Sequence, residues 1–319
     1  MNVLITGGAG FLGSNLALSL AQKGHDVFIY DNCQRGTHNL IELKNNNCKI
    51  IRGELDDIGD LFHKHSFDTI FHFAAQVAVT ASYESPRSDF RINAAGTFHL
   101  ASQAKIPIIY SSTNKVYGDN VNLIPLEEQE TRYDFANEFK KKGIPETFSI
   151  DAKKHTPYGV SKLTGELYVR EFGGVVNRFS CMYGPRQFGN IDQGWISHIL
   201  LAKLKGKPVT VYGDGKQVRD ILYVSDVVRL LELQMEHLDT IKGEVFNIGG
   251  GYDNTISLLE LLKKIQVQPL FADWRPADQK VYYSDISKAK QVLQWEPKVS
   301  REEGIKKIME WLEQNHHLF

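Results

Sequence analysis

Two side chains that can exchange protons stand four positions apart in the sequence, Tyr158 and Lys162. On a helix, positions i and i+4 share a face, so the phenol and the ammonium would point the same way. A tyrosine with an ordinary pKa of about 10 is a poor base at neutral pH. A neighbouring ammonium and a cationic ligand would both favour the phenolate, and lowering the pKa by about three units corresponds to about 4 kcal/mol. Pairs with this spacing also occur on ordinary helices, so the pair alone establishes no site.

A glycine-rich segment near the N-terminus has the spacing of a pyrophosphate-binding turn. Gly7, Gly10 and Gly13 follow the apolar run 3–6, and apolar residues then recur at helical spacing to residue 23. Glycines allow a tight turn and let the backbone approach a pyrophosphate at the positive end of a helix. In a strand–turn–helix context this motif strongly indicates a dinucleotide cofactor.

Asp31 ends the next apolar run, 26–31, where such motifs carry an acid that binds ribose. A carboxylate there accepts hydrogen bonds from an adenosine ribose and repels a 2′-phosphate, which favours NAD over NADP. Arg35 stands nearby, and a guanidinium can hold a phosphate, so these residues leave the choice between the two cofactors open.

The segment 111–118 is rich in hydroxyl groups and lies at the end of a predicted strand. Open α/β sheets bind their ligands beyond the carboxyl ends of the strands. A hydroxyl at that place, such as that of Thr113, can hydrogen-bond the substrate oxygen that loses its proton. Alone, the segment would be read as an ordinary polar turn.

The elements that must position these residues alternate along the chain. Helical spacing predicts helices at 11–23, from 157, and at 195–206, 225–238, 257–265 and 301–314. Nearly continuous apolar runs indicate strands buried on both faces of a parallel sheet, at 3–6, 26–31, 48–52, 68–73, 106–112 and 174–179. The alternation predicts an α/β fold, with a Rossmann-type doubly wound parallel sheet and a smaller mixed α/β substrate domain. The long polar segment 114–155 is expected to be functional or to carry small elements of its own.

Composition disfavours several classes of function. The 319 residues carry 37 Lys and Arg against 38 Asp and Glu, so the basic footprint of a nucleic-acid binder is missing. No apolar run approaches the ~18 residues of a membrane span, and the glycine motif starts too early to leave room for a signal peptide. We therefore expect a cytoplasmic protein with no nucleic-acid or membrane partner. The three cysteines, Cys33, Cys48 and Cys181, are too few and too scattered for a disulfide framework or a cysteine-based metal site. No metal is therefore expected.

In this order, the motifs resemble those of the extended short-chain dehydrogenase/reductase superfamily that acts on nucleotide sugars. The resemblance covers essentially the whole chain. It implies an NAD-binding Rossmann domain over residues 1–176, joined by part of 220–248, and a mainly nucleotide-sugar-binding domain over 177–319. The catalytic residues that it implies are Thr113, Tyr158 and Lys162.

The same resemblance implies a set of contacts with NAD. Glu54 stands where the family usually has Asp, so the contact beside the adenine is expected at Leu55 rather than at Glu54. Asn93 matches a structural asparagine of the family that lies close to the cofactor. The cofactor-binding residues implied are Gly7, Gly10, Phe11, Leu12, Gly13, Asp31, Asn32, Arg35, Leu55, Ala74, Gln76, Asn93, Tyr158 and Lys162.

The second half of the chain resembles the part of the family that binds the nucleotide sugar. Arg219 and Arg275 match arginines that hold the substrate diphosphate, and a guanidinium fork binds phosphate oxygens in a bidentate fashion. Asp278 matches an acid that meets the ribose. Cys181 departs from the asparagine that many members have near the diphosphate. The substrate-binding residues implied are Thr113, Asn114, Arg186, Gln187, Gln193, Arg219, Arg275 and Asp278.

The residues after Thr113 bear on the type of reaction. The 4,6-dehydratases of the family have an Asp–Glu pair there, to supply an acid and a base for elimination of water. Asn114 and Lys115 offer no carboxylate, which favours an epimerase. Segments 112–118 and 182–195 resemble the CDP-tyvelose (CDP-paratose) 2-epimerase branch. That branch implies an isomerase of lipopolysaccharide O-antigen sugar biosynthesis, which inverts C2 of a CDP-linked (deoxy)hexose through a transient 2-keto sugar.

Several alternatives stay open on the sequence. A nucleotide-sugar 4-epimerase or a 4,6-dehydratase-like enzyme shares every motif except those of the branch. A non-catalytic binding protein with this fold would typically lose the tyrosine or the lysine, and both are present here. The substrate is expected to be a CDP- or UDP-linked sugar. A homodimer or homotetramer is implied by the resemblance only.

Overall fold

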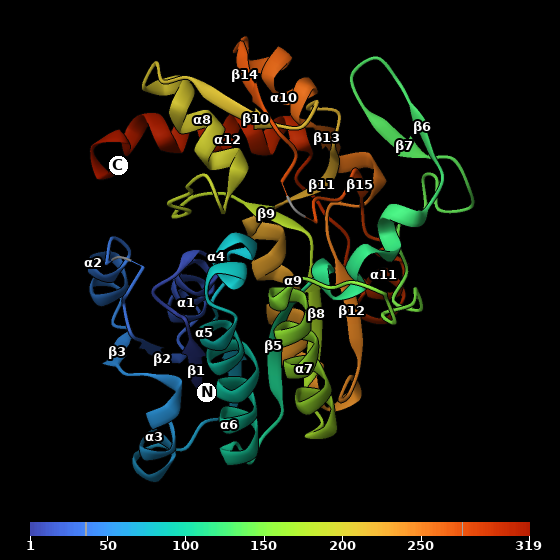
Figure 1. Ribbon diagram of the computed structural model, residues 1–319. Coiled ribbons are helices and arrows are strands. Elements are labelled where there is room, and N and C mark those ends of the chain that lie inside the picture. Colours follow the sequence, from blue (N-terminus) through green and yellow to red (C-terminus); the bar gives the residue numbers. More distant parts are fainter. Residues whose placement is uncertain (36, 276) are drawn as a thin grey trace. The chain divides into compact units, whose positions relative to one another are not determined.

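The computed structural model describes residues 1–35, 37–275 and 277–319 (Figure 1). The chain forms two compact units. Unit 1 comprises Met1–Thr113, Pro157–Arg178 and Val227–Phe246, and unit 2 comprises Asn114–Thr156, Phe179–Asp226 and Asn247–Phe319. The segment Asn114–Thr156 therefore groups with unit 2, although the sequence placed it with residues 1–176. The assignment of a binding role to each domain stays a prediction.

A seven-stranded parallel sheet organises unit 1. Its strand order is β12-β8-β5-β4-β1-β2-β3, so the chain reverses direction of winding between β1 and β4. The strands pair in parallel, with Asn2 beside Asp26 and Val3 beside Thr69. Ligands of such sheets bind beyond the carboxyl ends of the strands at this reversal. The strands are β1 (Asn2–Thr6), β2 (Asp26–Asp31), β3 (Lys49–Arg52), β4 (Thr69–His72), β5 (Ile108–Thr113), β8 (Val175–Phe179) and β12 (Val245–Ile248).

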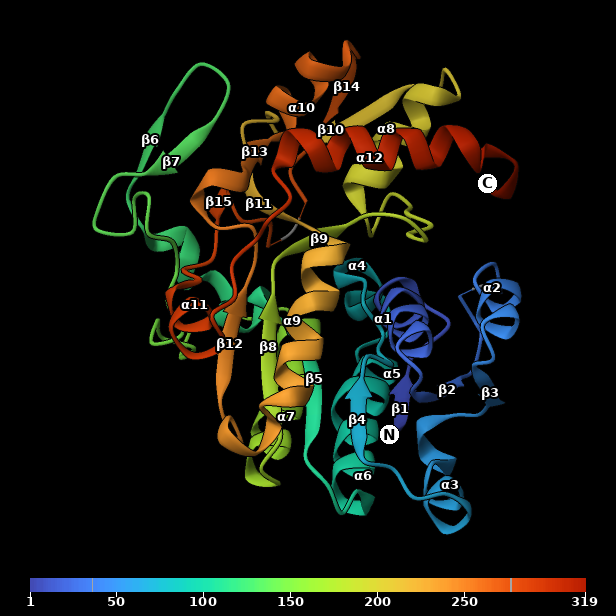
Figure 2. The same ribbon diagram turned by 180° about the vertical axis from the view of Figure 1, so that it is seen from behind.

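Helices cover both faces of this sheet. Figure 1 shows α5 (Pro86–Phe90), α6 (Gly96–Gln103) and α7 (Pro157–Glu171) over one face. Seen from behind in Figure 2, α1 (Phe11–Gln22) and α9 (Val224–Glu236) cover the other. Glu232 joins these two helices, because it accepts a hydrogen bond from Ser19 at 2.7 Å and pairs with Lys23 at 2.8 Å. The shorter helices are α2 (Leu40–Asn45), α3 (Gly59–Lys64) and α4 (Val79–Glu84).

The strand interiors form the core between these helix layers. Fully burying a Val, Leu, Ile or Phe side chain contributes about 1.5–3 kcal/mol to stability. Their apolar runs are continuous rather than alternating because both sides of each strand are covered. The fully buried residues include Leu4, Ile5, Ile29, Ile70, Phe71 and Ile109.

Unit 2 is a mixed α/β arrangement. Strand β11 (Val218–Tyr223) pairs in parallel with β9 (Cys181–Tyr183) and β15 (Val281–Tyr282), and antiparallel with β13 (Thr255–Ser257). Two further pairs are β10 (Val209–Tyr212) with β14 (Pro269–Ala272), and β6 (Leu126–Glu128) with β7 (Tyr133–Phe135). Its helices are α8 (Trp195–Leu204), α10 (Leu258–Ile265), α11 (Ser287–Leu293) and α12 (Arg301–Gln314).

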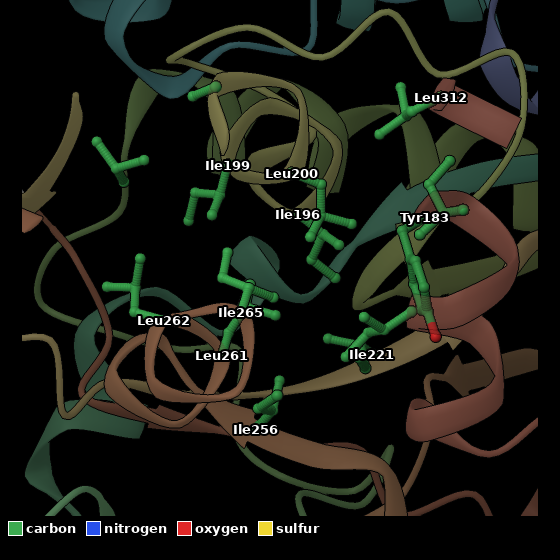
Figure 3. Close-up of a cluster of buried hydrophobic side chains, with 14 of the residues drawn as sticks. Tyr183, Ile196, Ile199, Leu200, Ile221, Ile256, Leu261, Leu262, Ile265 and Leu312 are labelled. Carbon is green, nitrogen blue, oxygen red and sulfur yellow. The ribbon is translucent and has the colours of Figure 1, made fainter. Parts of the chain in front are cut away.

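An aliphatic core of its own holds unit 2 together. Figure 3 shows Ile199 and Leu200 of α8 opposite Leu261 and Ile265 of α10. Leu312 of α12 belongs to the same cluster and is fully buried. Helix α10 starts at a capping box, in which Ser257 accepts from the backbone of Glu260 at 3.0 Å and Glu260 accepts in return at 2.9 Å. Such a box satisfies two amides that the helix itself leaves unpaired.

The predicted α/β fold class is confirmed by the parallel sheet and its two helix layers. The seventh strand, β12, has no counterpart among the strands predicted from the sequence. The long polar segment carries the hairpin β6–β7 and a run of 3₁₀ turns, Asn114–Leu123. Among the described residues, no helix combines the length and the apolar character that crossing a membrane requires.

Candidate cofactor and active site

The glycine turn after β1 has the close approaches that the sequence pattern predicts. Gly7 has a φ of 68°, and a Cβ there would lie 2.5 Å from the backbone nitrogen of Ala74. A Cβ at Gly13 would lie 2.5 Å from the carbonyl oxygen of Gly7. Any side chain at these two positions would collide with backbone. The turn leads directly into α1, whose first amides, as in any helix, have no partner within the helix. A pyrophosphate fits this cradle.

Asp31 lies at the end of β2, next to this turn. One carboxylate oxygen accepts the amide of Ala9 at 3.0 Å, and the other accepts the amide of Cys33 at 2.8 Å. Arg35 is within electrostatic range of both Asp31 and Tyr158, so the structure brings these three predicted residues together. The Asp31 carboxylate is thus fixed beside the predicted pyrophosphate turn.

Asn32 and Leu55 meet protein partners in this region. The Asn32 amide donates to both oxygens of Glu54, at 3.1 and 3.2 Å. Leu55 is buried and packs against Gly96, where a Cβ would lie 2.9 Å from it. Glu54 therefore orients Asn32. Their contacts with the cofactor stay predictions.

Asn93 lies on a five-residue π-helix, Arg91–Ala95, between α5 and α6. Such bulges often occur at functional sites. Its side chain is fully buried and exchanges two hydrogen bonds, each 2.9 Å, with the backbone of Gln76. One oxygen of Asp89 accepts from Gln76 at 2.8 Å and from Asn93 at 3.1 Å. No local pattern in the sequence marks this buried carboxylate, so it was not predicted.

The three predicted catalytic residues meet at the carboxyl end of β5 and the start of α7. Thr113 ends β5, and its side chain hydrogen-bonds the Tyr158 hydroxyl. Tyr158 and Lys162 occupy successive turns of α7 and are 9% and 2% exposed. The Lys162 ammonium lies 4.1 Å from the centroid of the Tyr110 ring. This arrangement can hold a hydroxyl substrate between a proton acceptor and a hydrogen-bonding partner.

Burial dominates the electrostatics of this pair. It raises the pKa of Tyr158 to about 12, while the hydrogen bond from Thr113 acts in the opposite direction. Burial also lowers the pKa of Lys162 to about 7, against the raising effect of Glu166 and Asp89. The sequence predicts that a neighbouring ammonium, together with the positive charge of a bound cofactor, makes Tyr158 a base. In this structure the phenol is the favoured form, so further positive charge is needed.

A buried ion pair lies one helical turn beyond Lys162. Glu166 is 1% exposed, and Arg178 of β8, 3% exposed, approaches its carboxylate at 2.8 and 3.1 Å. Ser112 donates to the same carboxylate at 2.5 Å. The pair joins α7 to β5 and β8. Nothing in the sequence shows that Glu166 and Arg178 meet, so neither was predicted as part of the site.

Within unit 2, Arg219 and Asp278 form an ion pair of 2.7 Å, with side chains 13% and 23% exposed. The predictions gave them separate ligands, diphosphate and ribose, whereas the structure pairs them. Lys115 is within electrostatic range of both and donates to the Gln279 amide oxygen at 3.3 Å. Asn114 donates to the same oxygen at 3.4 Å.

Cys181 borders this cluster of charges. The Trp195 indole donates to its sulfur at 3.5 Å, and burial raises the pKa of the thiol. Arg219 and Lys115 both act on that thiol in the opposite direction. The Cys181 thiol is therefore within electrostatic range of the charged cluster of unit 2.

Arg275 lies beside a cavity of about 440 Å³ in unit 2. Its guanidinium stacks 4.1 Å from the centroid of the Tyr212 ring and donates to the carbonyl of Ile191 at 2.8 Å. Asp278 lines the same cavity, so the structure brings these two predicted substrate residues together. The cavity is lined by Asn122, Ile124, Leu126, Trp274, Arg275, Ala277, Asp278 and Lys280.

The other predicted substrate residues lie on the loop between β9 and α8. Arg186 adopts a positive φ of 66°. The Gln187 amide is buried, donates to the carbonyl of Met182 at 3.0 Å and accepts from Ser197 at 2.6 Å. The backbone amide of Gln193 donates to the side chain of Asn190 at 3.0 Å. Gln187 thus shapes this loop, and its substrate contact, like those of Arg186 and Gln193, stays a prediction.

Known proteins are similar to this chain over nearly its whole length. The family model described as GDP-mannose 4,6 dehydratase matches residues 4–308. A CDP-paratose 2-epimerase of Salmonella typhi is 38% identical over 339 aligned positions, covering 98% of this chain and 99% of that protein. The solved UDP-glucose 4-epimerase of Thermotoga maritima with UDP-glucose has a TM-score of 0.83 and 32% identity, over 99% of this chain and 100% of that one. The UDP-glucuronic acid 4-epimerase of Bacillus cereus, with UDP-glucuronic acid and NAD, has a TM-score of 0.81 and 28% identity, over 98% and 99%.

Proposed function

Because this chain belongs to the GDP-mannose 4,6 dehydratase family of extended short-chain dehydrogenases/reductases, we propose that it is an NAD-dependent epimerase that inverts C2 of a CDP-linked deoxyhexose. The observation that carries the proposal is the meeting of Thr113, Tyr158 and Lys162, with no carboxylate at the two positions after Thr113. Elimination of water needs an added acid and base, whereas epimerisation does not. The 38% identity with a CDP-paratose 2-epimerase supports C2 as the reacting carbon and CDP as the carrier.

The proposed chemistry assigns one task to each catalytic side chain. Bound NAD supplies the acceptor for the hydride that the sugar carbon loses and, once reduced, the donor that returns it to the other face. Tyr158 removes the proton of the sugar 2-hydroxyl and gives it back after the 2-keto sugar has turned over. Thr113 hydrogen-bonds the reacting oxygen through both steps, and Lys162 stabilises the phenolate. No net oxidation occurs, so the cofactor is expected to remain bound.

Two buried carboxylates favour the protonated form of Lys162. Burial lowers the pKa of Lys162 to about 7, so at neutral pH the ammonium is only just maintained. Asp89 and Glu166 both act to raise that pKa. With the ammonium held, the positive charge of the bound cofactor is the further contribution that Tyr158 needs to ionise.

A nucleotide-sugar 4-epimerase is the second candidate. It is favoured by the 32% identity with the UDP-glucose 4-epimerase of Thermotoga maritima, which covers the whole of that chain. The two candidates share the tyrosine, the lysine and the cofactor. They differ in the carbon that is presented to Tyr158 and in the nucleotide that is bound.

For the substrate, we propose that unit 2 supplies the phosphate-binding side chains. Arg219 and Arg275 are its guanidinium groups next to Asp278, and such forks bind diphosphate oxygens well. When a diphosphate binds, Arg219 would exchange part of its pairing with Asp278 for phosphate oxygens. Further contacts are proposed for Asn114, Arg186, Gln187 and Gln193.

We also propose that the protein is a homodimer through α6 and α7. Phe98 of α6 and Tyr168 of α7 are each 42% exposed, and their rings lie 4.7 Å apart. Val160 and Leu167, at 49% and 54% exposure, extend the same helix face of α7. An apolar stripe of this kind is typical of a helix-to-helix interface. Light scattering of the purified protein tests this directly.

The test of the function begins with what the purified protein carries. The protein is denatured and the released small molecules are identified by mass spectrometry, and bound NAD is expected. The protein is then incubated with CDP- and UDP-linked sugars, and the ring protons are followed by NMR. Inversion at C2 of a CDP-sugar supports the proposal. Inversion at C4 of a UDP-sugar contradicts it and favours the second candidate.

A further inference from the structure

Lys115 is the first cationic residue after the catalytic Thr113, and it lies in a half-buried polar cluster of unit 2. Its ammonium donates to the Gln279 amide oxygen at 3.3 Å, and Asn114 donates to the same oxygen at 3.4 Å. Gln279 is 1% exposed, and among the described residues its amide nitrogen has no hydrogen-bond partner. The cluster therefore presents a buried donor that is not used within unit 2.

The charges around Lys115 are unbalanced. Arg219 and Asp278 pair at 2.7 Å, and both act on Lys115, together with the thiol of Cys181. Two cations thus surround one carboxylate in partly buried surroundings. Burial, with Arg219 as the next cause, lowers the pKa of Lys115 to about 8. These surroundings disfavour the ammonium form of Lys115, and a bound anion would favour it.

We propose that the Lys115 ammonium binds the phosphate that is attached to the sugar, and that this contact selects C2 as the reacting carbon. The inference rests on the proposed function and deepens it, because it assigns a ligand to a residue that the family motifs leave without one. The Gln279 amide nitrogen and Arg219 supply the neighbouring donors. The negative charge of a diphosphate would offset the excess positive charge of Lys115 and Arg219 over Asp278.

Chain connectivity ties this contact to the choice of carbon. One residue separates Thr113 from Lys115, so their Cα atoms lie at most about 7 Å apart. The sugar-side phosphate is attached through oxygen to C1, and C2 is the adjoining carbon. A reacting C2 therefore lies close to this phosphate. A reacting C4 stands across the ring from it, and a phosphate-binding cation next to Thr113 would then be poorly placed.

The experiment compares nucleotide binding to the NAD-loaded wild type and to three variants by titration calorimetry. Lys115→Met removes the charge, and Lys115→Arg keeps a charge that does not titrate in this range. Lys207→Met, on an exposed residue, controls for the loss of one positive charge. The ligands are CDP, UDP, CMP and UMP, at about pH 7 and about pH 9 and in two buffers of different ionisation enthalpy.

Lys115→Met is expected to lose about tenfold to a hundredfold in affinity for CDP, the range of one charge-assisted hydrogen bond. Its affinity for CMP, which lacks the second phosphate, should change less than about threefold. In the wild type, CDP binding should weaken above about pH 8 and take up protons there, since the diphosphate favours the ammonium of Lys115. Lys115→Arg should keep most of the CDP affinity without the proton uptake, and Lys207→Met should behave as wild type.

The proposed phosphate contact would be wrong if Lys115→Met bound CDP as tightly as the wild type. It would also be wrong if Lys115→Arg took up as many protons on binding CDP as the wild type. If Lys115→Met does not fold, the proton uptake of Lys115→Arg decides. If inversion is found at C4 while Lys115→Met loses CDP affinity, the proposed function and the selection of C2 are wrong and the phosphate contact stands. If inversion is found at C2 while Lys115→Met binds CDP normally, the inference is wrong and the proposed function stands. Absence of binding of either nucleoside diphosphate to the wild type would overturn both.

Discussion

The buried ion pair between Glu166 and Arg178 gives a sharp prediction about stability. Replacing Glu166 by Gln keeps the size of the side chain but removes the charge that Arg178 needs. Arg178 contacts this carboxylate at 2.8 and 3.1 Å and is only 3% exposed, so water cannot replace the lost partner. Breaking a buried pair from one side costs about 3–5 kcal/mol. We therefore expect the free energy of unfolding of Glu166→Gln to fall by that amount.

The assay is urea unfolding followed by circular dichroism, with equal slopes required for wild type and variant. The double variant Glu166→Leu with Arg178→Met removes both charges and should cost less than Glu166→Gln alone, because no unpaired charge is left. The matched control is Asp26→Ala, which breaks an exposed ion pair with Lys49 in the same unit and should leave stability nearly unchanged. A loss below about 1 kcal/mol in Glu166→Gln would refute the reasoning, since it would mean that Arg178 finds other partners.

Three further predictions concern the active site, the cofactor turn and the interface. Tyr158→Phe should lower turnover by about 10²–10⁴ while NAD remains bound, as measured by NMR of the sugar and by mass spectrometry of the released cofactor. Gly7→Ala should copurify with little or no NAD, because the φ of 68° and the 2.5 Å approach to Ala74 leave no room for a methyl group; a full complement of NAD would contradict this. Leu167→Glu should convert the dimer to a monomer in light scattering, since it places a charge on the exposed apolar face of α7, whereas the exposed Lys207→Glu should not.

The sequence predicted the fold class and the elements near the active site because their signals are local. The apolar strands of the sheet, the glycine turn and the i, i+4 pair on α7 can each be read within a few residues. The family and the NAD-dependent nucleotide-sugar chemistry that it carries are confirmed by the match over residues 4–308 and by the relatives. The contacts predicted for individual site residues stay predictions.

Residues that depend on distant pairing were not predicted. Asp89 and Glu166 are carboxylates in helices, and only the folded chain shows that both are buried around Lys162. The seventh strand, β12, is recognised by its place beside β8 rather than by its short sequence. Lys115 was noted in the sequence only for the carboxylate that it lacks, because its closeness to Arg219 and Asp278 arises from segments far apart in the chain.

The effect of burial on the pKa of Tyr158 could not be read from the sequence. The expectation from the sequence rested on the attraction of a neighbouring ammonium and of the cofactor's positive charge, without desolvation. In the structure, burial outweighs the other contributions and raises the pKa to about 12. The positive charge of a bound cofactor would favour the phenolate, so a Tyr158 that ionises near neutral pH in the cofactor-free protein would contradict this explanation.

The most direct test of the proposed function uses a CDP-linked deoxyhexose that carries deuterium at C2. The purified protein is incubated with this substrate and the product is examined by NMR. The proposed chemistry predicts inversion at C2 with the deuterium retained on C2, because the hydride that leaves the carbon returns to it. Inversion at C4 with C2 untouched, or inversion at C2 with loss of the deuterium to solvent, would contradict it.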